Sequence, residues 1–179
     1  SHLHAPGIGV GGHCIPIYPY FFINNGLEEG IISLARNKND SMARYAVEKI
    51  EQQTGNLQNK NILILGLSYR ENVKEATKST TLLLIDPLKQ KQGNVYVHDP
   101  LFSDEEIKRY GAQPLALSDP LIRHVDIIIL QTFHDEYKHL DYRQFSNCKL
   151  ILDGRNKIDK NEILKLGIRY EGIGRKGEP

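Results

Sequence analysis

The sequence predicts an α/β protein in which a Rossmann-like, doubly wound parallel sheet follows a helical segment. From residue 61 onward, short apolar runs alternate with amphipathic helical stretches, and this alternation is typical of a parallel sheet with helices on both faces. The stretch before it lacks the alternation and repeats its apolar residues with helical spacing. We therefore divide the 179-residue chain into a helical unit, residues 1–56, and a Rossmann-like unit, residues 57–179.

The composition excludes several classes of protein. With 40% hydrophobic residues the chain can form a sizeable core, and a net charge of +1 gives no electrostatic reason to expect nucleic acid as a partner. No apolar run approaches the roughly 20 residues of a membrane-spanning helix, so we expect no membrane insertion. Cys14 and Cys148 lie in dissimilar contexts, which predicts no disulfide framework and fits the cytoplasm. The set His2, His4, His13 and Cys14 matches no zinc spacing, so no metal site is predicted.

A loop rich in glycine and proline, residues 6–22, lies near the start of the helical unit. Pro19 suits the first turn of a helix, so we expect the loop to enter a helix there. Gly11 and Gly12 would let the backbone approach a ligand closely. Cys14 would then precede a helix N-terminus, where the positive end of the helix dipole favours a thiolate. A lone cysteine is more often a small buried residue, but the glycine context makes Cys14 a candidate nucleophile.

A long helix is predicted over residues 27–54, after a first short helix stops at residues 24–26. The apolar stripe of the long helix consists of Ile31, Leu34, Ala35, Met42, Tyr45, Ala46 and Ile50. These side chains cannot all be buried on a sheet that begins at residue 61. The stripe therefore predicts a second surface, through which the chain associates.

The remaining elements alternate along the chain. Apolar runs predict parallel strands over residues 61–66, 94–98, 125–130, 149–153 and 168–171. Helical stretches are predicted over residues 80–88, 104–110, 115–124 and 161–166, the third of them after a possible short strand. Strands and helices in this order indicate a doubly wound sheet, whose ligands gather at the carboxyl ends of the strands.

The first strand of the sheet ends at Gly66, which raises the question of dinucleotide binding. The pattern G-x-G-x-x-G needs three glycines, whereas this loop has one, and the bulky Tyr69 and Arg70 stand where a pyrophosphate needs bare backbone. Asp99 follows the second strand, where an NAD-binding domain keeps an acid for the ribose. Before Pro100 it is better explained as a turn-capping residue. The sequence therefore predicts a Rossmann-like sheet that does not hold NAD itself.

Side chains at the strand ends offer a different kind of nucleotide site. The predicted carboxyl ends carry Tyr69, Arg70, Thr132, His134 and Arg155. Two arginines at one edge would suit a phosphate group, because a guanidinium binds phosphate oxygens through paired hydrogen bonds. For either arginine alone, a surface ion pair is an equally good explanation.

The loop sequence GVGGHCIPIYPYFF resembles the catalytic-cysteine loop of the UDP-glucose/GDP-mannose dehydrogenase family. Its His-Cys form is closest to the branch that acts on UDP-N-acetylhexosamines. Residues 35–40 resemble an Ala-Arg-x-x-Asn-Asp signature in a long helix of the family's central domain. Further matches at residues 66–70, 72–79, 132–134, 153–156 and 172–175 follow in the family's order. The resemblance thus covers the C-terminal portion of such an enzyme, from about residue 6 to residue 175.

The resemblance implies an NAD-dependent oxidation of a UDP-sugar, UDP-N-acetylmannosamine or UDP-N-acetylglucosamine, in which a 6-hydroxyl becomes a carboxylate in two hydride transfers. It implies a UDP-binding domain, a homodimer built on the long helix, and an N-terminal NAD-binding domain absent from this fragment, which alone is expected to be inactive. The implied catalytic residues are Cys14 and Tyr18. The implied substrate contacts are Gly7, Gly11, Tyr69, Arg70 and Arg155, and the implied cofactor contacts are Ile17, Thr77 and Lys78.

Three positions bear on that implication. Tyr18 stands where the family usually has Asp, and a phenol with a pKa near 10 is a poor base. Thr77 stands where an arginine of the family reaches NAD, whereas Ile17 agrees with the acetylhexosamine branch.

A stand-alone nucleotide-binding, dimerising module without catalysis is an alternative, but it would have no use for the cysteine loop. A small NAD-binding dehydrogenase domain is another, which the missing glycines disfavour.

Overall fold

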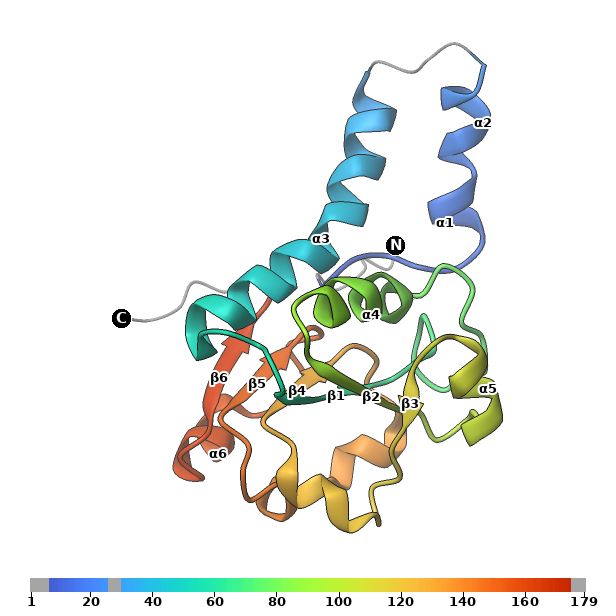
Figure 1. Ribbon diagram of the computed structural model, residues 1–179. Coiled ribbons are helices and arrows are strands. Elements are labelled where there is room, and N and C mark those ends of the chain that lie inside the picture. Colours follow the sequence, from blue (N-terminus) through green and yellow to red (C-terminus); the bar gives the residue numbers. More distant parts are fainter. Residues whose placement is uncertain (1–6, 26–29, 175–179) are drawn as a thin grey trace.

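The computed structural model describes residues 7–25 and 30–174 and contains a six-stranded parallel sheet (Figure 1). The strands are β1 (Asn61–Leu65), β2 (Asn94–His98), β3 (Gln113–Pro114), β4 (Ile127–Leu130), β5 (Leu150–Asp153) and β6 (Arg169–Gly172). Their order across the sheet is β3-β2-β1-β4-β5-β6, and every neighbouring pair is parallel. This is the Rossmann order, in which the direction of winding reverses between β1 and β4. The predicted fold class is confirmed.

Helices cover both faces of the sheet, because the strand side chains alternate between two hydrophobic clusters. Ile62 and Ile64 of β1 belong to the cluster that contains the helices α3 (Ile31–Thr54) and α4 (Thr80–Gln90). Leu63 and Leu65 belong to the opposite cluster. That second face is covered by η1 (Pro120–His124), η2 (Asp135–His139), η3 (Tyr142–Gln144) and α6 (Lys160–Lys165), while α5 (Asp104–Arg109) lies beside β3 (Figure 1).

The five strands expected from the sequence are all present, with bounds that differ by at most two residues. The possible short strand before residue 115 is β3, and the helical stretch after it is reduced to the 3₁₀ turn η1. The long helix ends at Thr54 as expected, whereas the expected start at residue 27 lies outside the described residues.

The long helix α3 has two different environments along its length. Its C-terminal half packs on the sheet through the buried residues Ala43, Ala46, Val47 and Ile50. Its N-terminal half runs beside α2 (Pro19–Ile23) and leaves Ile31 83% and Leu34 67% exposed. The expectation that the apolar stripe cannot be buried entirely on the sheet is therefore confirmed. The boundary placed at residue 56 stays a prediction, because the second half of α3 shares a core with the sheet.

The helices α1 (Cys14–Ile17) and α2, together with the N-terminal half of α3, form an arm that stands away from the sheet (Figure 1). The expectation that Cys14 precedes the helix is wrong, because the helical backbone begins at Cys14 itself and continues through Tyr18 into α2. Pro16 and Pro19 fit because each lies in a first turn, where a backbone N–H has no partner within the helix.

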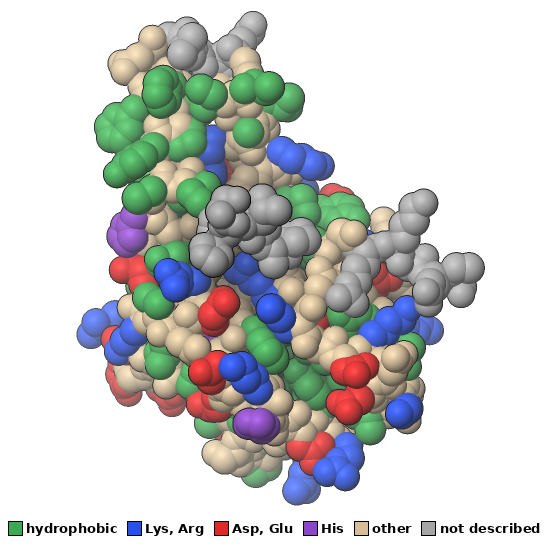
Figure 2. Space-filling view, turned by 180° about the vertical axis from the view of Figure 1, so that it is seen from behind, with side chains coloured by type: hydrophobic (Ala, Val, Ile, Leu, Met, Phe, Trp, Pro, Cys, Tyr) green, Lys and Arg blue, Asp and Glu red, His purple; other side chains and the backbone are tan. Residues whose placement is uncertain are grey.

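Apolar side chains gather on the arm (Figure 2). The exposed ones are Ile15, Tyr18, Tyr20, Phe21, Phe22, Ile31 and Leu34. A contiguous apolar surface of this kind marks an interaction site in most proteins. Across the described part of the chain, no helix combines the length and the hydropathy needed to cross a bilayer.

Candidate functional site

The glycine loop lies at the carboxyl ends of the strands, in contact with the loops that follow β1 and β5. A Cβ atom on Gly7 would lie 2.5 Å from the carbonyl oxygen of Gly154, and one on Gly11 would lie 2.5 Å from that of Lys78. Gly12 has a φ of +100°, and a Cβ there would lie 2.9 Å from the ring of Tyr69. Only glycine can bring the backbone this close, so the loop sequence seats Cys14 at the sheet edge where nucleotide ligands gather.

The motif at residues 35–40 holds the glycine loop from the other side. The side-chain oxygen of Asn39 accepts the amide of Val10 at 2.8 Å, and its amide donates to the Val10 carbonyl at 3.3 Å. Arg36 donates to Asp40 at 2.5 Å and lies over the ring of Tyr20, which belongs to α2. The motif therefore joins the loop, the arm and α3. Sequence reasoning missed this role, since Asn39 and Val10 are 29 positions apart.

The two residues expected to be catalytic lie one helical turn apart. Cys14 is exposed, and the amide of Tyr18 donates to the Cys14 carbonyl at 3.0 Å. The Tyr18 side chain is 59% exposed, and its interaction with the Cys14 side chain raises the pKa of the phenol above its ordinary value. Tyr18 is therefore neutral at physiological pH and can donate a hydrogen bond to the sulfur.

A short segment after β1 is tied to the residues around Cys14. The carbonyl of Thr77 accepts the amide of Gly12 at 2.9 Å. Glu75 accepts the amide and the hydroxyl of Thr77 at 2.9 and 2.5 Å, and its other carboxylate oxygen lies 3.3 Å from Nε2 of His13. The hydrogen bonds from Thr77, assisted by His13, lower the pKa of Glu75. Thr77, expected at the cofactor, is thus engaged within the chain.

The buried side chain of Asp99 holds the loop that follows β1 through hydrogen bonds to its backbone amides. One carboxylate oxygen of Asp99 accepts the amides of Leu67 and Ser68 at 2.7 and 2.8 Å. Its other oxygen accepts the amide of Leu101 at 2.9 Å, which confirms the expected turn-capping role. Burial alone would raise the pKa of Asp99, but hydrogen bonds from His134 and the amides outweigh burial and lower it. The amides that a pyrophosphate would need are occupied.

Two polar residues after β4 also point inward rather than toward a ligand. Thr132 donates to the Ser68 carbonyl at 2.5 Å, and a Cβ on Gly66 would lie 2.5 Å from the Thr132 side chain. Nδ1 of His134 accepts the amide of Asn72 at 3.0 Å, so Nε2 carries the proton and donates to Asp99 at 3.0 Å. Since Thr132 and His134 are buried and satisfied, they shape the edge without offering groups to a nucleotide.

Arg155 links the loops after three strands. Its Nε donates to the Gln131 carbonyl at 2.6 Å, and its Nη2 lies 3.4 Å from the Tyr69 carbonyl. Burial lowers its pKa, although a guanidinium stays charged at any physiological pH. Arg70, the other expected phosphate contact, is exposed beside Tyr69. The structure thus brings Tyr69, Arg155 and Gly7 together, and Arg155 has a structural role that sequence reasoning missed.

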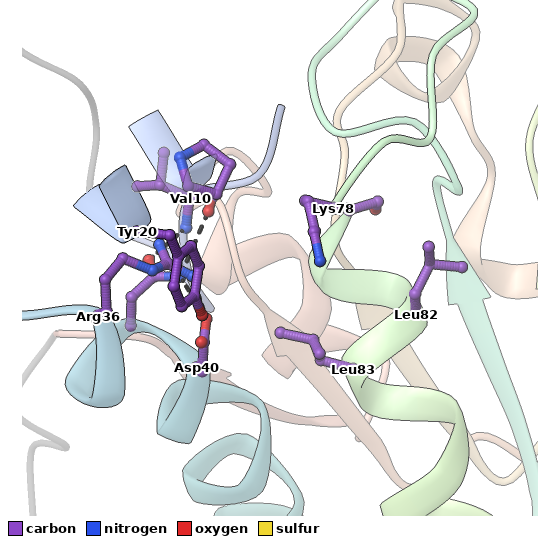
Figure 3. A pocket seen from close by; sticks show the side chains of 10 residues that line it. Val10, Tyr20, Arg36, Asp40, Lys78, Leu82 and Leu83 are labelled. Atoms are coloured by element: carbon purple, nitrogen blue, oxygen red, sulfur yellow. Dashed lines mark hydrogen bonds and ion pairs between the residues drawn. The ribbon is translucent and has the colours of Figure 1, made fainter. Parts of the chain in front are cut away.

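Lys78, another expected cofactor contact, lines a cavity of about 230 Å³ between the arm and the N-terminus of α4. Figure 3 shows Lys78 and Leu83 on one side of it and Tyr20, Arg36 and Asp40 on the other. Its full lining is Val10, Pro16, Tyr20, Arg36, Asn39, Asp40, Lys78, Ser79, Leu82 and Leu83. Lys78 has a φ of +50°, a left-handed backbone that is uncommon outside glycine. Ile17 is half-buried on α1.

Comparisons with known proteins agree with this geometry. Residues 63–160 match the profile described as the UDP-glucose/GDP-mannose dehydrogenase family, UDP binding domain. The chain belongs to this family.

Within residues 7–25 and 30–174 no three His, Cys, Asp or Glu side chains group as metal ligands, and His2 and His4 lie outside those ranges.

Relatives of the chain carry the names of nucleotide-sugar dehydrogenases. UDP-N-acetyl-D-mannosamine dehydrogenase of Pyrococcus horikoshii is 29% identical over 97% of this chain and 40% of the relative, and that of Methanococcus aeolicus is 31% identical over 94% and 39%. Among solved structures, NDP-N-acetyl-D-galactosaminuronic acid dehydrogenase from Methanosarcina mazei superposes with a TM-score of 0.81, 26% identity, and coverage of 98% of this chain and 40% of that one. The chain spans about 40% of the length of these relatives.

Proposed function

We propose that the chain is the C-terminal part of an NAD-dependent UDP-sugar 6-dehydrogenase that oxidises a sugar 6-hydroxyl to a carboxylate. The observation that carries the proposal is the seating of the cysteine loop, in which Gly12 packs on the ring of Tyr69. The contact supports a site in which Cys14 and the side chains offered to UDP share one edge of one sheet. The names of the relatives support a UDP-N-acetylhexosamine, with UDP-N-acetylmannosamine as the first candidate.

In this proposal, residues 57–179 bind the UDP half of the substrate. Arg70 is exposed at the strand ends and meets a phosphate group, while Tyr69 and Arg155 form the wall beneath it. Gly7 and Gly11 contribute to the substrate site through the loop backbone, which their lack of a side chain lets pack against Gly154 and Lys78. The occupied amides after β1 support a site in which side chains, rather than a glycine-rich turn, hold the nucleotide.

Cys14 provides the covalent step. A thiolate adds to the aldehyde left by the first oxidation and forms a thiohemiacetal, from which a second oxidation gives a thioester. A thiol suits this step better than a hydroxyl, because it ionises near neutral pH. Tyr18 donates a hydrogen bond near the sulfur and the developing oxyanion. Hydrolysis of the thioester then releases the carboxylate.

NAD, when bound, would accept the hydride that leaves the substrate. Within this chain the loop after β1 does not fit the cofactor, since Asp99 takes the amides that a pyrophosphate would use. The contacts that this chain would contribute are Ile17 on α1, Lys78 at the cavity, and Thr77, whose hydroxyl donates to Glu75 and could offer only its oxygen to the cofactor. We further propose that the chain forms a homodimer through the arm. We also propose that it works in the cytoplasm, because both of its cysteines are free thiols.

The experiment that tests the substrate half of the proposal is calorimetry of the chain with UDP and NAD side by side. UDP should bind, weakly if the chain forms only part of the site, and NAD should not bind detectably. Arg70→Ala should weaken UDP about tenfold or more, because it removes charge-assisted hydrogen bonds of about 1.5–3 kcal/mol each. The matched control is Arg123→Ala, which lies before β4 and so at the opposite edge of the sheet. Tighter binding of NAD than of UDP would overturn the assignment.

A further inference from the structure

His13 and Glu75 form a pair beside the reactive cysteine. Nε2 of His13 lies 3.3 Å from the Glu75 carboxylate, while the other oxygen of that carboxylate accepts two hydrogen bonds from Thr77. Those hydrogen bonds lower the pKa of Glu75, so the carboxylate is ionised at neutral pH. Glu75 is also fixed through its backbone, whose carbonyl accepts the amide of Tyr69 at 2.9 Å. The carboxylate is therefore a rigid acceptor aimed at His13.

The pair determines which nitrogen of His13 can act as a base. An ionised carboxylate only accepts hydrogen bonds, so Nε2 of His13 carries the proton and Nδ1 keeps its lone pair. The His13 side chain is 57% exposed, and water can therefore reach the ring. An imidazole oriented by a carboxylate is a common arrangement for a general base next to a nucleophile.

Tyr18, the other candidate base near the thiol, is unsuited to this task. Tyr18 lies one turn after Cys14, and the interaction with the Cys14 side chain raises the pKa of its phenol further above neutral pH. A general base works best when its pKa lies near the pH of the reaction, which an imidazole satisfies and a phenol does not. Hydrolysis of a thioester at Cys14 needs such a base, because water is a weak nucleophile at neutral pH.

We propose that His13, oriented by Glu75, is the general base that activates the water for hydrolysis of the thioester on Cys14. The inference deepens the proposed function and rests on it. The water oxygen bonds to the acyl carbon while one water proton moves to Nδ1 of His13. The carbon–sulfur bond then breaks, its electron pair stays on the sulfur of Cys14, and the acid product ionises. Glu75 is the positioning residue, which acts through His13.

The pH dependence of this step is set by the groups around the imidazole. Among the described residues, the charged group in contact with it is Glu75, from the segment after β1, and Cys14 is its neighbour in the chain. A negative charge this close favours the imidazolium. Replacing it should therefore move the inflection of the rate to lower pH.

The test uses the chain itself and p-nitrophenyl acetate, which transfers an acetyl group to a reactive thiol without any cofactor. The loss of acetyl from the Cys14 peptide is followed by mass spectrometry between pH 5 and pH 9. In the wild type the rate should rise with pH to a plateau through one inflection. His13→Gln should lower the plateau rate about 100-fold and remove the inflection.

Three variants separate this role from a merely structural one. Glu75→Gln should slow deacetylation less than His13→Gln and shift the inflection to lower pH. His13→Ala should recover deacetylation when free imidazole is added, which a structural defect would not show. Glu162→Gln, on α6 at the other face of the sheet, is the matched control and should behave as wild type.

Four outcomes would overturn the inference: an unchanged rate in His13→Gln, no recovery of His13→Ala with imidazole, a large slowing in Tyr18→Phe alone, or no acetylation of Cys14 at all. UDP binding is measured on the same preparations to separate this result from the proposed function. If UDP still binds but substitution of His13 leaves the rate of deacetylation unchanged, only the assignment of the base is overturned. If UDP does not bind but substitution of His13 slows deacetylation, only the substrate assignment is overturned.

Discussion

The two cysteines of the chain show how burial and hydrogen bonding set reactivity at a single residue. Cys14 is exposed at the start of α1. Cys148 is buried before β5 and donates to the Leu150 carbonyl at 3.4 Å, and burial raises the pKa of its thiol to about 12. Since the thiolate is the nucleophile, Cys148 should be nearly inert at neutral pH.

We therefore expect iodoacetamide to label Cys14 much faster than Cys148 in the folded chain. The raised pKa of Cys148 leaves very little thiolate at pH 7.5, and its burial limits access of the reagent. Time-resolved peptide mapping measures both rates in one sample, and a sample unfolded in urea serves as the control, where the two rates should converge. Faster labelling of Cys148 in the folded chain would contradict the assignment of Cys14 as the reactive thiol.

Asp99 is the residue whose charge contributes most clearly to stability. It is 3% exposed and accepts from three amides, a serine hydroxyl and His134. Asp99→Asn should lower the free energy of unfolding by about 3 kcal/mol, because it leaves buried donors without a charged acceptor. Urea unfolding at pH 7 measures the loss. Asp119→Asn, an exposed cap of η1, is the matched control and should cost about 1 kcal/mol or less.

The same carboxylate predicts a direction for the pH dependence of stability. The pKa of Asp99 is lower in the folded chain than in the unfolded one. Its contribution is therefore fully present above the unfolded value near 4 and is lost as the pH falls through the folded value. Unfolding curves between pH 7 and pH 2 should show a decline in the wild type that Asp99→Asn largely lacks. Parallel declines would show that other groups dominate acid unfolding.

At the scale of elements, α3 is the support on which the glycine loop rests. The side chain of Asn39 accepts the amide of Val10 and donates to its carbonyl, so it satisfies both backbone groups as a neighbouring β-strand would. Asn39→Ala should loosen the loop and raise hydrogen exchange at the Val10 amide about tenfold, the equivalent of 1.4 kcal/mol, near the usual worth of one hydrogen bond. Asn37→Ala, exposed on the same helix, is the control. Equal protection in both variants would show that the glycine packing alone holds the loop.

At the scale of the whole molecule, the fold could be predicted because its signals are local. The central strands contain apolar runs, as at residues 62–65, and a recognisable helix lies between β1 and β2 and between β2 and β3. Only short 3₁₀ turns, which the sequence does not announce, lie between β4 and β5. The bounds of α1 were missed because Pro16 and Pro19 suggested a break, although both lie in first turns where proline is tolerated.

The supports of the site could not be predicted, because they join residues that are far apart in the chain. Asp99 meets the loop after β1 across 32 positions, and Asn39 meets Val10 across 29. Nothing in the local pattern at either position distinguishes such a contact from a turn cap or a solvated helix face. The resemblance of the cysteine loop pointed to Cys14 and Tyr18, whose side chains interact in the structure, but the contact of Glu75 with His13 emerged only from the folded geometry.

The last prediction concerns association of whole chains through the arm. The exposed apolar residues of α2 and of the N-terminal half of α3 form one surface, and removing it from water would be favourable at about 25 cal/mol per Å² (Figure 2). Closed twofold pairs are the commonest assemblies. Sedimentation at micromolar concentration should therefore show a dimer, and Leu34→Glu should convert it to a monomer, because a charge would be buried at the contact.

The matched control for that experiment is Leu164→Glu. Leu164 is 47% exposed on α6, on the face of the sheet away from the arm, so its replacement adds the same charge without touching the proposed contact. The control should stay dimeric. A wild-type monomer, or equal dissociation in both variants, would contradict an interface on the arm and leave the apolar surface to another partner.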